Sequence, residues 1–217
     1  MGVLTQSLPK PLIPVAGVPL IDHAISVADD AGIMRRVMNL HYKGDLLAAH
    51  VAGRNIGLSW ESGQILETGG GLRAALPMLG SGPVLVLNTD AVWTGLNPLV
   101  QLLAAWDDAG MDALLLLLPV EKATGHLGTG DFLMTPEGRL SRAGGMPGLV
   151  YLGAQIIRTE TLDGFPEAVF SLNRVWDRMI GLGRVFGLVH QGGWCDVGRP
   201  DGIASAESLL AKVDDVS

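Results

Sequence analysis

The sequence has little of what several classes of protein depend on. Only one of its 217 residues is a cysteine, Cys195, so no internal disulfide framework is available and the chain suits a reducing compartment. The longest unbroken apolar run, residues 113–120, is too short to cross a bilayer. We therefore expect a cytoplasmic protein without a membrane span.

Basic residues are also scarce. Lysines and arginines number 15 against 22 aspartates and glutamates, the formal net charge is −7, and the basic residues do not cluster. Nucleic acid and anionic membranes are therefore poor partners, and we expect a monomer or homodimer that acts on small molecules. A small phosphorylated ligand is still compatible with this charge, because a few placed cations and a metal ion outweigh the global sign.

Apolar residues, by contrast, are abundant. They make up 48% of the chain against 17% charged residues, so we expect one domain with a large core over residues 1–217. The first nineteen residues hold four prolines and predict an ordered loop. Helical and strand-like patterns then alternate, which predicts an α/β fold with a mixed, mostly parallel sheet, and a late run of strands adds a small antiparallel section. The expected helices are 20–31, 43–51, 72–79, 98–109, 172–182 and 200–212, and the expected strands are 36–42, 58–61, 84–90, 112–119, 130–134, 139–141, 148–157 and 185–190.

The segment VLVLNTD, residues 84–90, is the strongest single indication of a site. Its apolar run predicts a strand covered on both faces, and it ends in Asn88-Thr89-Asp90. Ligands of open parallel sheets bind beyond the carboxyl ends of the strands, where a carboxylate can hold a metal ion against a phosphate. Asp196 lies in a similar tight stretch after a strand, so the two aspartates could share one Mg²⁺. The alternative for an isolated aspartate is to cap the next turn.

Three further segments carry candidate ligand contacts. Lys10 lies between two prolines that stiffen its backbone, which suits a phosphate contact, although a solvated lysine is the alternative. Gly69-Gly70-Gly71 precede a predicted helix and could bring backbone N–H groups close to a nucleotide, or could form a flexible connector. Asp131 lies in the predicted hairpin and could face a polar substrate or remain a surface residue.

Taken in order, these segments resemble the sugar-1-phosphate nucleotidyltransferases. The matching motifs cover nearly the whole chain in the family's order; they are LPKPL at 8–12, ETGGG at 67–71, NTD at 88–90, GDF at 130–132 and WCDVG at 194–198. The short length, ETGGG and GDF are most similar to the N-acetylmuramate-1-phosphate uridylyltransferase branch. The mannose-1-phosphate guanylyltransferases are the next most similar.

The resemblance implies a Rossmann-like nucleotidyltransferase fold of the GT-A type, a three-layer sandwich. It also implies an enzyme that joins a nucleoside triphosphate to a sugar 1-phosphate and releases pyrophosphate, with UTP and N-acetylmuramate 1-phosphate as substrates in cell-wall sugar recycling. The implied roles are Asp90 and Asp196 as Mg²⁺ ligands; Lys10 and Asp90 as catalytic residues; Lys10, Glu67, Gly69, Gly70 and Gly71 at the nucleotide; and Asn88, Asp131 and Gly153 at the sugar.

The resemblance also exposes a difference at the start of the sequence. Family members begin with a buried strand and a glycine-rich loop, approximately LAAGxGTRM, ahead of the segment that matches Gly2 onward. That strand would lie between residues 37–40 and 84–87. We therefore expect a longer native chain, because without this strand two neighbouring strands would keep unpaired backbone beside a hole in the core.

Two hypotheses of other classes stay open. A non-catalytic nucleotide- or sugar-binding protein is favoured by the missing loop, whereas Lys10, Asp90 and Asp196 favour an enzyme. A structural partner in a complex is the other, because tryptophans such as Trp60 and Trp93 could form an apolar patch, although core packing explains them equally well.

Overall fold

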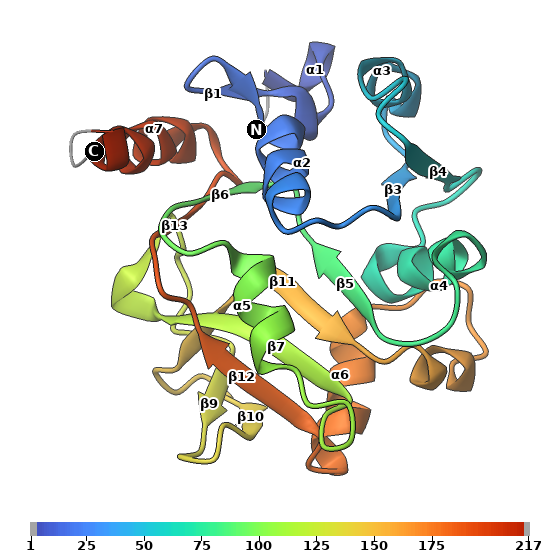
Figure 1. Ribbon diagram of the computed structural model, residues 1–217, viewed down its shortest axis with the longest axis vertical. Coiled ribbons are helices and arrows are strands. Elements are labelled where there is room, and N and C mark those ends of the chain that lie inside the picture. The colour runs from blue at the N-terminus through green and yellow to red at the C-terminus, as the bar shows by residue number, and fades with distance from the viewer. Residues whose placement is uncertain (1–3, 215–217) are drawn as a thin grey trace.

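A six-stranded sheet forms the middle of the protein in the computed structural model, which describes residues 4–214 (Figure 1). Five strands follow the order β10-β9-β11-β7-β12, and β5 lies beside β11 off this path. The strands are β5 (Val84–Leu87), β7 (Ala113–Pro119), β9 (Phe132–Met134), β10 (Leu140–Arg142), β11 (Leu149–Ile157) and β12 (Val185–Val189).

Strand β11 runs against its neighbours. It pairs antiparallel with both β5 and β7, while β12 pairs parallel with β7. Strands β5, β7 and β12 therefore point the same way, and β11 is inserted between two of them. The predicted mixed sheet is confirmed, with its antiparallel ladders concentrated on this one strand and on the β9–β10 hairpin.

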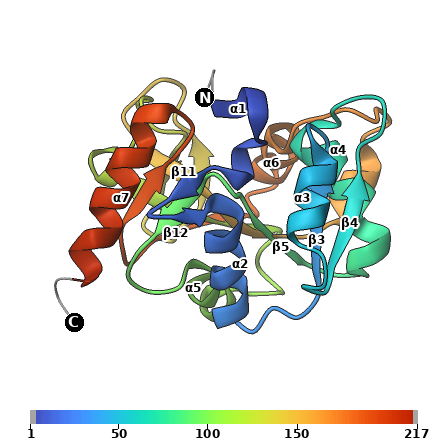
Figure 2. The same ribbon diagram turned by 90° about the horizontal axis from the view of Figure 1, so that it is seen from above.

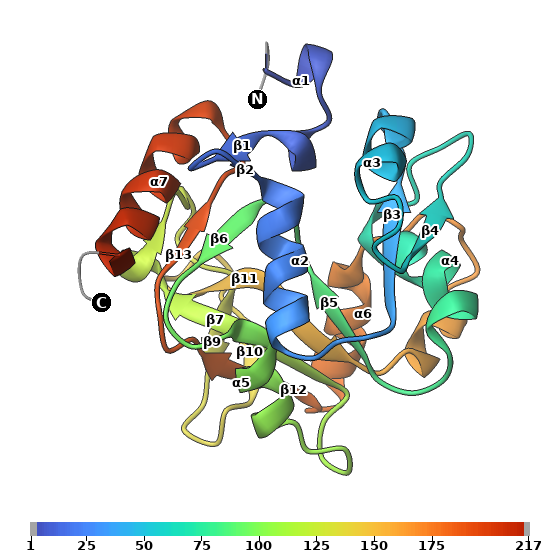
Figure 3. The same cartoon turned by 45° about the horizontal axis from the view of Figure 1, so that its top comes forward.

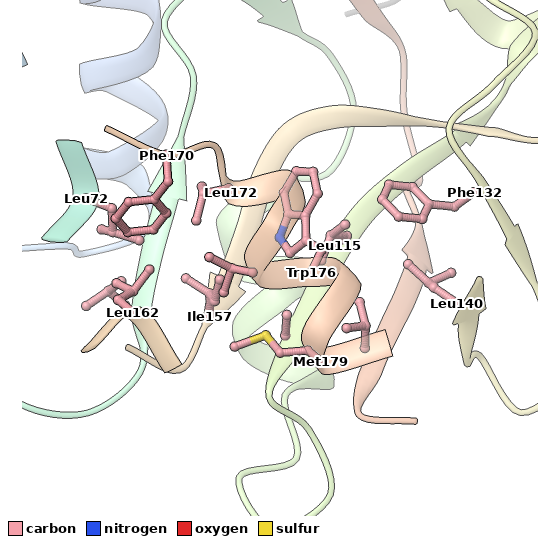
Figure 4. Packing of buried hydrophobic residues seen from close by; sticks show 14 of the residues in the cluster. Leu72, Leu115, Phe132, Leu140, Ile157, Leu162, Phe170, Leu172, Trp176 and Met179 are labelled. Carbon is pink, nitrogen blue, oxygen red and sulfur yellow. The ribbon is translucent and has the colours of Figure 1, made fainter. Parts of the chain in front are cut away.

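Helices cover both faces of this sheet, as the view from above shows (Figure 2). Strand β7 explains why, because its alternate leucines serve different layers: Leu115 and Leu117 pack toward α4 (Glu67–Leu79) and α6 (Leu172–Gly181), and Leu114 and Leu116 pack toward α5 (Pro98–Ala105). In Figure 4, Trp176 and Met179 of α6 lie over Leu115 and Ile157. All these leucines are at most 2% exposed, as an uninterrupted apolar strand predicts.

A second group of elements brings the N-terminal segment together with the last helix of the chain. Helix α7 (Pro200–Asp214) packs beside a three-stranded sheet in the order β6-β13-β8, and beside the β1–β2 hairpin. The predicted loop over the first nineteen residues instead holds short ordered elements. They are α1 (Leu4–Ser7), the 3₁₀ helix η1 (Lys10–Leu12), β1 (Pro14–Val15) and β2 (Val18–Pro19), and the other strands are β6 (Ala91–Trp93), β8 (Ala123–Thr124) and β13 (Trp194–Asp196).

Strands β3 (Arg36–Leu40) and β4 (Ile56–Trp60) form a separate two-stranded parallel sheet, with α3 (Gly44–His50) beside them (Figure 3). Between β3 and β5, within residues 4–214, no strand ladder is formed, and a cleft of about 630 Å³ lies there instead. Helix α2 (Leu20–Asp30) and α4 also line it. The resemblance implies a further strand between residues 37–40 and 84–87, which lie on the two sides of this cleft.

The element boundaries agree with expectation to within a few residues, with one exception. Helix α5 begins at Pro98 because the side chain of Asn97 accepts hydrogen bonds from the N–H groups of Leu99 and Val100. Helix α4, however, begins at Glu67 and not at residue 72, so the three glycines lie inside its first turns. Short 3₁₀ turns also occur at η2 (Val120–Lys122) and η3 (Glu160–Gly164).

Candidate active site

Asp90 and Asp196 are brought together by strand pairing. Asp90 immediately precedes β6, and Asp196 is the last residue of β13, whose antiparallel partner is β6. Asp196 faces Ala91 in the ladder, and the N–H of Val197 donates to the carbonyl oxygen of Asp90 over 2.8 Å. The sequence could suggest that these carboxylates meet, and the sheet β6-β13-β8 is the reason they do.

Lys10 joins them from the N-terminal segment. Pro9 and Pro11 flank it, and η1 carries its side chain to Asp90, where Nζ lies 2.7 Å from Oδ2. The two side chains are 28% and 39% exposed, so the ion pair is open to ligands and contributes little to stability. The predicted catalytic lysine and aspartate are therefore direct neighbours.

The two carboxylates influence each other. Burial, and then the negative charge of Asp90, raise the pKa of the Asp196 carboxyl above its ordinary value. The N–H of Gly198, which donates to Asp196 Oδ1 over 2.8 Å, together with Lys10 and His126, acts in the opposite direction. A site with two acids and one nearby lysine has spare negative charge, which favours a further cation.

The donor set fits a hard divalent cation that shares its ligands with substrate. Within residues 4–214 no group of three or more His, Cys, Asp or Glu side chains gathers for a metal. Two carboxylates and no nitrogen or sulfur ligand are what Mg²⁺ commonly uses, because it completes its shell with water and substrate phosphates. Asp90 and Asp196 are the residues that would hold such an ion.

The glycine triplet is positioned by packing on the segment before α6. The N–H groups of Gly69 and Gly70 both donate to the carbonyl oxygen of Phe170, at 2.9 and 3.0 Å. A Cβ on Gly69 would lie 2.5 Å from the Phe170 ring, and one on Gly70 would collide with the carbonyl oxygen of Ala168. These two N–H groups therefore bond within the protein, and Gly69 and Gly70 form a close contact with the segment before α6.

Gly71 and Glu67 face the cleft. A Cβ on Gly71 would lie 2.8 Å from Glu61 Oε1 and 3.1 Å from Asn39 Nδ2, and Asn39 donates to the carbonyl oxygen of Gly71 over 2.9 Å. Glu67 has a φ of +59°, a left-handed conformation that is costly for a residue with a side chain. Both residues line the same cleft as Lys10 and Asp90. Of the residues expected at the nucleotide, Lys10, Glu67 and Gly71 therefore share one cleft.

Asn88 and Gly153 touch each other. Gly153 lies in an irregularity of β11 with a φ of +79°, and the N–H of Asn88 donates to its carbonyl oxygen over 2.7 Å. A Cβ on Gly153 would lie 2.8 Å from Asn88 Cβ and 2.9 Å from its Nδ2. The space over this glycine is thus taken by the Asn88 side chain, which itself lines the cleft.

Asp131 lies next to the same strand. Its Oδ2 accepts a hydrogen bond of 2.8 Å from the N–H of Tyr151, and its own N–H donates to the carbonyl oxygen of Leu149. Asp131 therefore joins the start of β9 to β11 through two hydrogen bonds.

Several residues that line the cleft were not singled out from the sequence as ligand contacts. Tyr151 and Trp176 are among them, as are Asn39 and Glu61. The tyrosine and the tryptophan lie in apolar patterns typical of a core strand and a core helix, so no local signal separates them from packing residues.

Comparison with known proteins decides the family. The model of the MobA-like NTP transferase domain matches residues 1–126. The N-acetylmuramate alpha-1-phosphate uridylyltransferase of Caulobacter vibrioides is 39% identical over 98% of this chain and 92% of its own length. This chain belongs to the MobA-like NTP transferase family.

Other members of the family agree with this assignment. The enzyme of the same name from Neisseria meningitidis is 34% identical over 96% of this chain and 92% of its own length. Relatives at lower identity include mannose-1-phosphate guanyltransferases. HddC from Yersinia pseudotuberculosis, solved in complex with GMP-PN, shares the fold with a TM-score of 0.77 at 19% identity, covering 94% of this chain and 90% of HddC. The chain is thus a nucleotidyltransferase with the α/β fold expected.

Proposed function

We propose that this nucleotidyltransferase transfers uridine monophosphate from UTP to N-acetylmuramate 1-phosphate, giving the nucleotide sugar and pyrophosphate. The observation that carries the proposal is the cluster of Lys10, Asp90 and Asp196, of which Lys10 and Asp90 line the cleft. Two relatives that match over 92% of their own length carry the name of this activity. A role in recycling cell-wall sugars follows from that choice of sugar.

The residues divide the task between two anionic substrates. A phosphate oxygen of the sugar 1-phosphate attacks the α-phosphorus of the nucleoside triphosphate, and pyrophosphate leaves. The attacking phosphate is already a nucleophile, so the protein needs no general base and contributes alignment and charge neutralisation. Lys10 supplies a positive point charge to phosphate, and Glu67 and Gly71 lie on the nucleotide side of the cleft.

Magnesium belongs to the same proposal. Held by Asp90 and Asp196, Mg²⁺ would draw the phosphates together and neutralise charge in the transition state. Asn88, Asp131 and Gly153 would shape the sugar side of the site. The expected cytoplasmic location and a monomeric or homodimeric state are also part of it. Among the residues described, no helix has the length and apolar character to traverse a membrane.

One further strand in the cleft completes the proposal. Strand β5 pairs with β11 alone among the described strands and β3 pairs with β4 alone, so each keeps one edge toward the cleft. Leu85 and Leu87 of β5, and Val37 and Met38 of β3, are only partly buried, although they are apolar. An extended apolar segment followed by a glycine-rich loop would cover these side chains, pair both edges and bring backbone donors to the phosphates.

Two rivals remain to be tested against it. The guanyltransferase relatives favour GTP and mannose 1-phosphate as the alternative substrates. A binding protein without turnover would retain nucleotide affinity but would gain little from two adjacent carboxylates.

The deciding experiment measures pyrophosphate release with Mg²⁺. UTP, GTP, CTP and dTTP are each paired with N-acetylmuramate, N-acetylglucosamine, glucose and mannose 1-phosphate, for the 217-residue chain and for a form extended upstream to the next in-frame start. We expect UTP with N-acetylmuramate 1-phosphate to give the highest kcat/KM, and the extended form to be the more active. Nucleotide binding without turnover in both forms would refute the enzyme.

Substitution of Asp90 tests the metal assignment. Asp90→Asn keeps the size of the side chain and removes its charge, so we expect turnover to fall by about a hundredfold or more. Asp29→Asn is the matched control, because Asp29 also pairs with one basic side chain, that of Arg36 at 2.5 Å, but lies outside the cleft lining. Near wild-type activity of Asp90→Asn would refute the role given to Asp90.

A further inference from the structure

Tyr151 lies at the point where β11 departs from regular pairing. The register between β11 and β7 shifts between Tyr151 and Gln155, and Gly153 takes its left-handed φ inside this interval. Irregularities of this kind re-aim side chains and often lie beside active sites. Here the irregular segment faces Asn88, two residues before Asp90.

Two contacts hold Tyr151 in place. Its N–H donates to Asp131 Oδ2 over 2.8 Å, and its ring packs edge-to-face on Trp176 with 4.9 Å between the centroids. Trp176 packs in the same manner on Phe132, next to Asp131 in the sequence. The backbone of Tyr151 is thus held by Asp131, and its ring packs on Trp176 of α6, which in turn packs on Phe132.

A buried amide contacts Trp176. Gln155 is 0% exposed, and its Oε1 accepts a hydrogen bond of 2.9 Å from Trp176 Nε1. Because an indole N–H can only donate, this bond identifies the oxygen of the Gln155 amide. Gln155 Nε2 forms no hydrogen bond with any described residue. The side chain of Gln155 also lowers the pKa of the Tyr151 phenol, against the larger rise that burial causes.

The other side of the phenol faces the cleft. Tyr151 lines the same cleft as Asp90, Asn88 and Thr68. Burial raises the pKa of the phenol far above its ordinary value, and the negative charge of Asp90 adds to the rise. The hydroxyl therefore keeps its proton. A protonated phenol in the wall of the cleft can donate its proton to a ligand bound there.

We propose that the Tyr151 hydroxyl donates a hydrogen bond to an oxygen of the sugar 1-phosphate, which makes Tyr151 a substrate-binding residue of this nucleotidyltransferase. The inference rests on the proposed function and adds a contact to its sugar side. Tyr151 is on the sugar side because its N–H bonds to Asp131 and because Gly153 follows it on β11, while Glu67 and Gly71 lie on α4 at the nucleotide side.

The test compares two tyrosine variants. Tyr151→Phe keeps the ring and its packing on Trp176 and removes only the hydroxyl. We expect the KM for N-acetylmuramate 1-phosphate to rise about tenfold, the size of one lost hydrogen bond, with the KM for UTP changed less than about twofold. Tyr42→Phe is the matched control, because the other tyrosine of the chain is exposed and donates to the carbonyl oxygen of Thr5.

Direct binding gives a second readout. Calorimetric titration of sugar 1-phosphate into protein with Mg²⁺ and a non-hydrolysable UTP analogue should show the same tenfold loss for Tyr151→Phe, and none for Tyr42→Phe. Unchanged sugar 1-phosphate binding in Tyr151→Phe, or a loss confined to UTP, overturns the inference while wild-type turnover upholds the proposed function. A wild-type protein that binds none of the sugar 1-phosphates overturns both.

Discussion

Gly70→Ala tests whether the glycines at the start of α4 are there for packing or for a ligand. The structure places Gly70 against the segment before α6, where an added Cβ would meet a backbone oxygen, that of Ala168. A backbone atom cannot swing away like the end of a long side chain. The segment has to move, or the helix has to shift.

The expected loss of stability is about 2–3 kcal/mol. Overpacking of this kind costs about 1–3 kcal/mol, and moving the segment weakens the bonds from Gly69 and Gly70 to Phe170 by about 0.5–1.5 kcal/mol each. Alanine regains about 1 kcal/mol over glycine inside a helix. For a chain of this size the loss corresponds to a melting temperature lower by about 4–12 °C.

Thermal unfolding followed by circular dichroism measures this shift, and Gly71→Ala is the matched control. Its Cβ would meet the carboxylate of Glu61 and the amide of Asn39, which can rotate away, so its melting temperature should stay within about 2 °C of wild type. Gly71→Ala should instead raise the KM for the nucleotide, since Gly71 lines the cleft. If Gly70→Ala melted like wild type and lost nucleotide affinity, the packing role would be refuted.

Three further predictions follow from single residues. Glu67→Gly relieves a left-handed φ of +59° and should stabilise the protein by about 1 kcal/mol in urea unfolding; a clear loss of stability would contradict the strain. Burial lowers the pKa of His190, so the unfolded chain binds the extra proton and the free energy of unfolding should fall as the pH drops below about 6.5. His190→Gln should flatten that fall between about pH 5 and 8. An unchanged slope would exclude His190 as its source. Lys10→Met should reduce kcat about a hundredfold and change the free energy of unfolding by less than about 1 kcal/mol, because its ion pair with Asp90 is partly exposed; equal losses of both would make Lys10 structural.

The parts of the fold that could be predicted are those with strong local signals. The apolar run at residues 112–119 predicted a strand, and the structure buries β7 almost completely. The run at residues 84–87, for which two covered faces were expected, forms the partly buried β5. The helix expected from residue 98 begins there, as α5. The position of Asp90 after a buried strand predicted the edge of the sheet at which polar side chains gather, and Lys10 lies there.

What could not be predicted depends on contacts between distant segments. The three glycines gave no sign that Phe170 and Ala168 would occupy the space beside them, so helix α4 was placed to begin five residues late. The insertion of β11 between β5 and β7 leaves no local pattern, since a buried antiparallel strand has the same apolar composition as a parallel one. Tyr151 was overlooked for the same reason.

The pairing of β6 with β13 has a consequence for the newly made protein. Lys10, Asp90 and Asp196 are separated by 80 and 106 residues along the chain, and the last of them arrives on β13. At about 5–20 residues per second, several seconds of synthesis separate the emergence of Asp90 from that of Asp196. During that time β6 has no β13 to pair with and the carboxylate pair does not exist. A nascent chain can therefore pair β5, β7 and β11 before it has an active site.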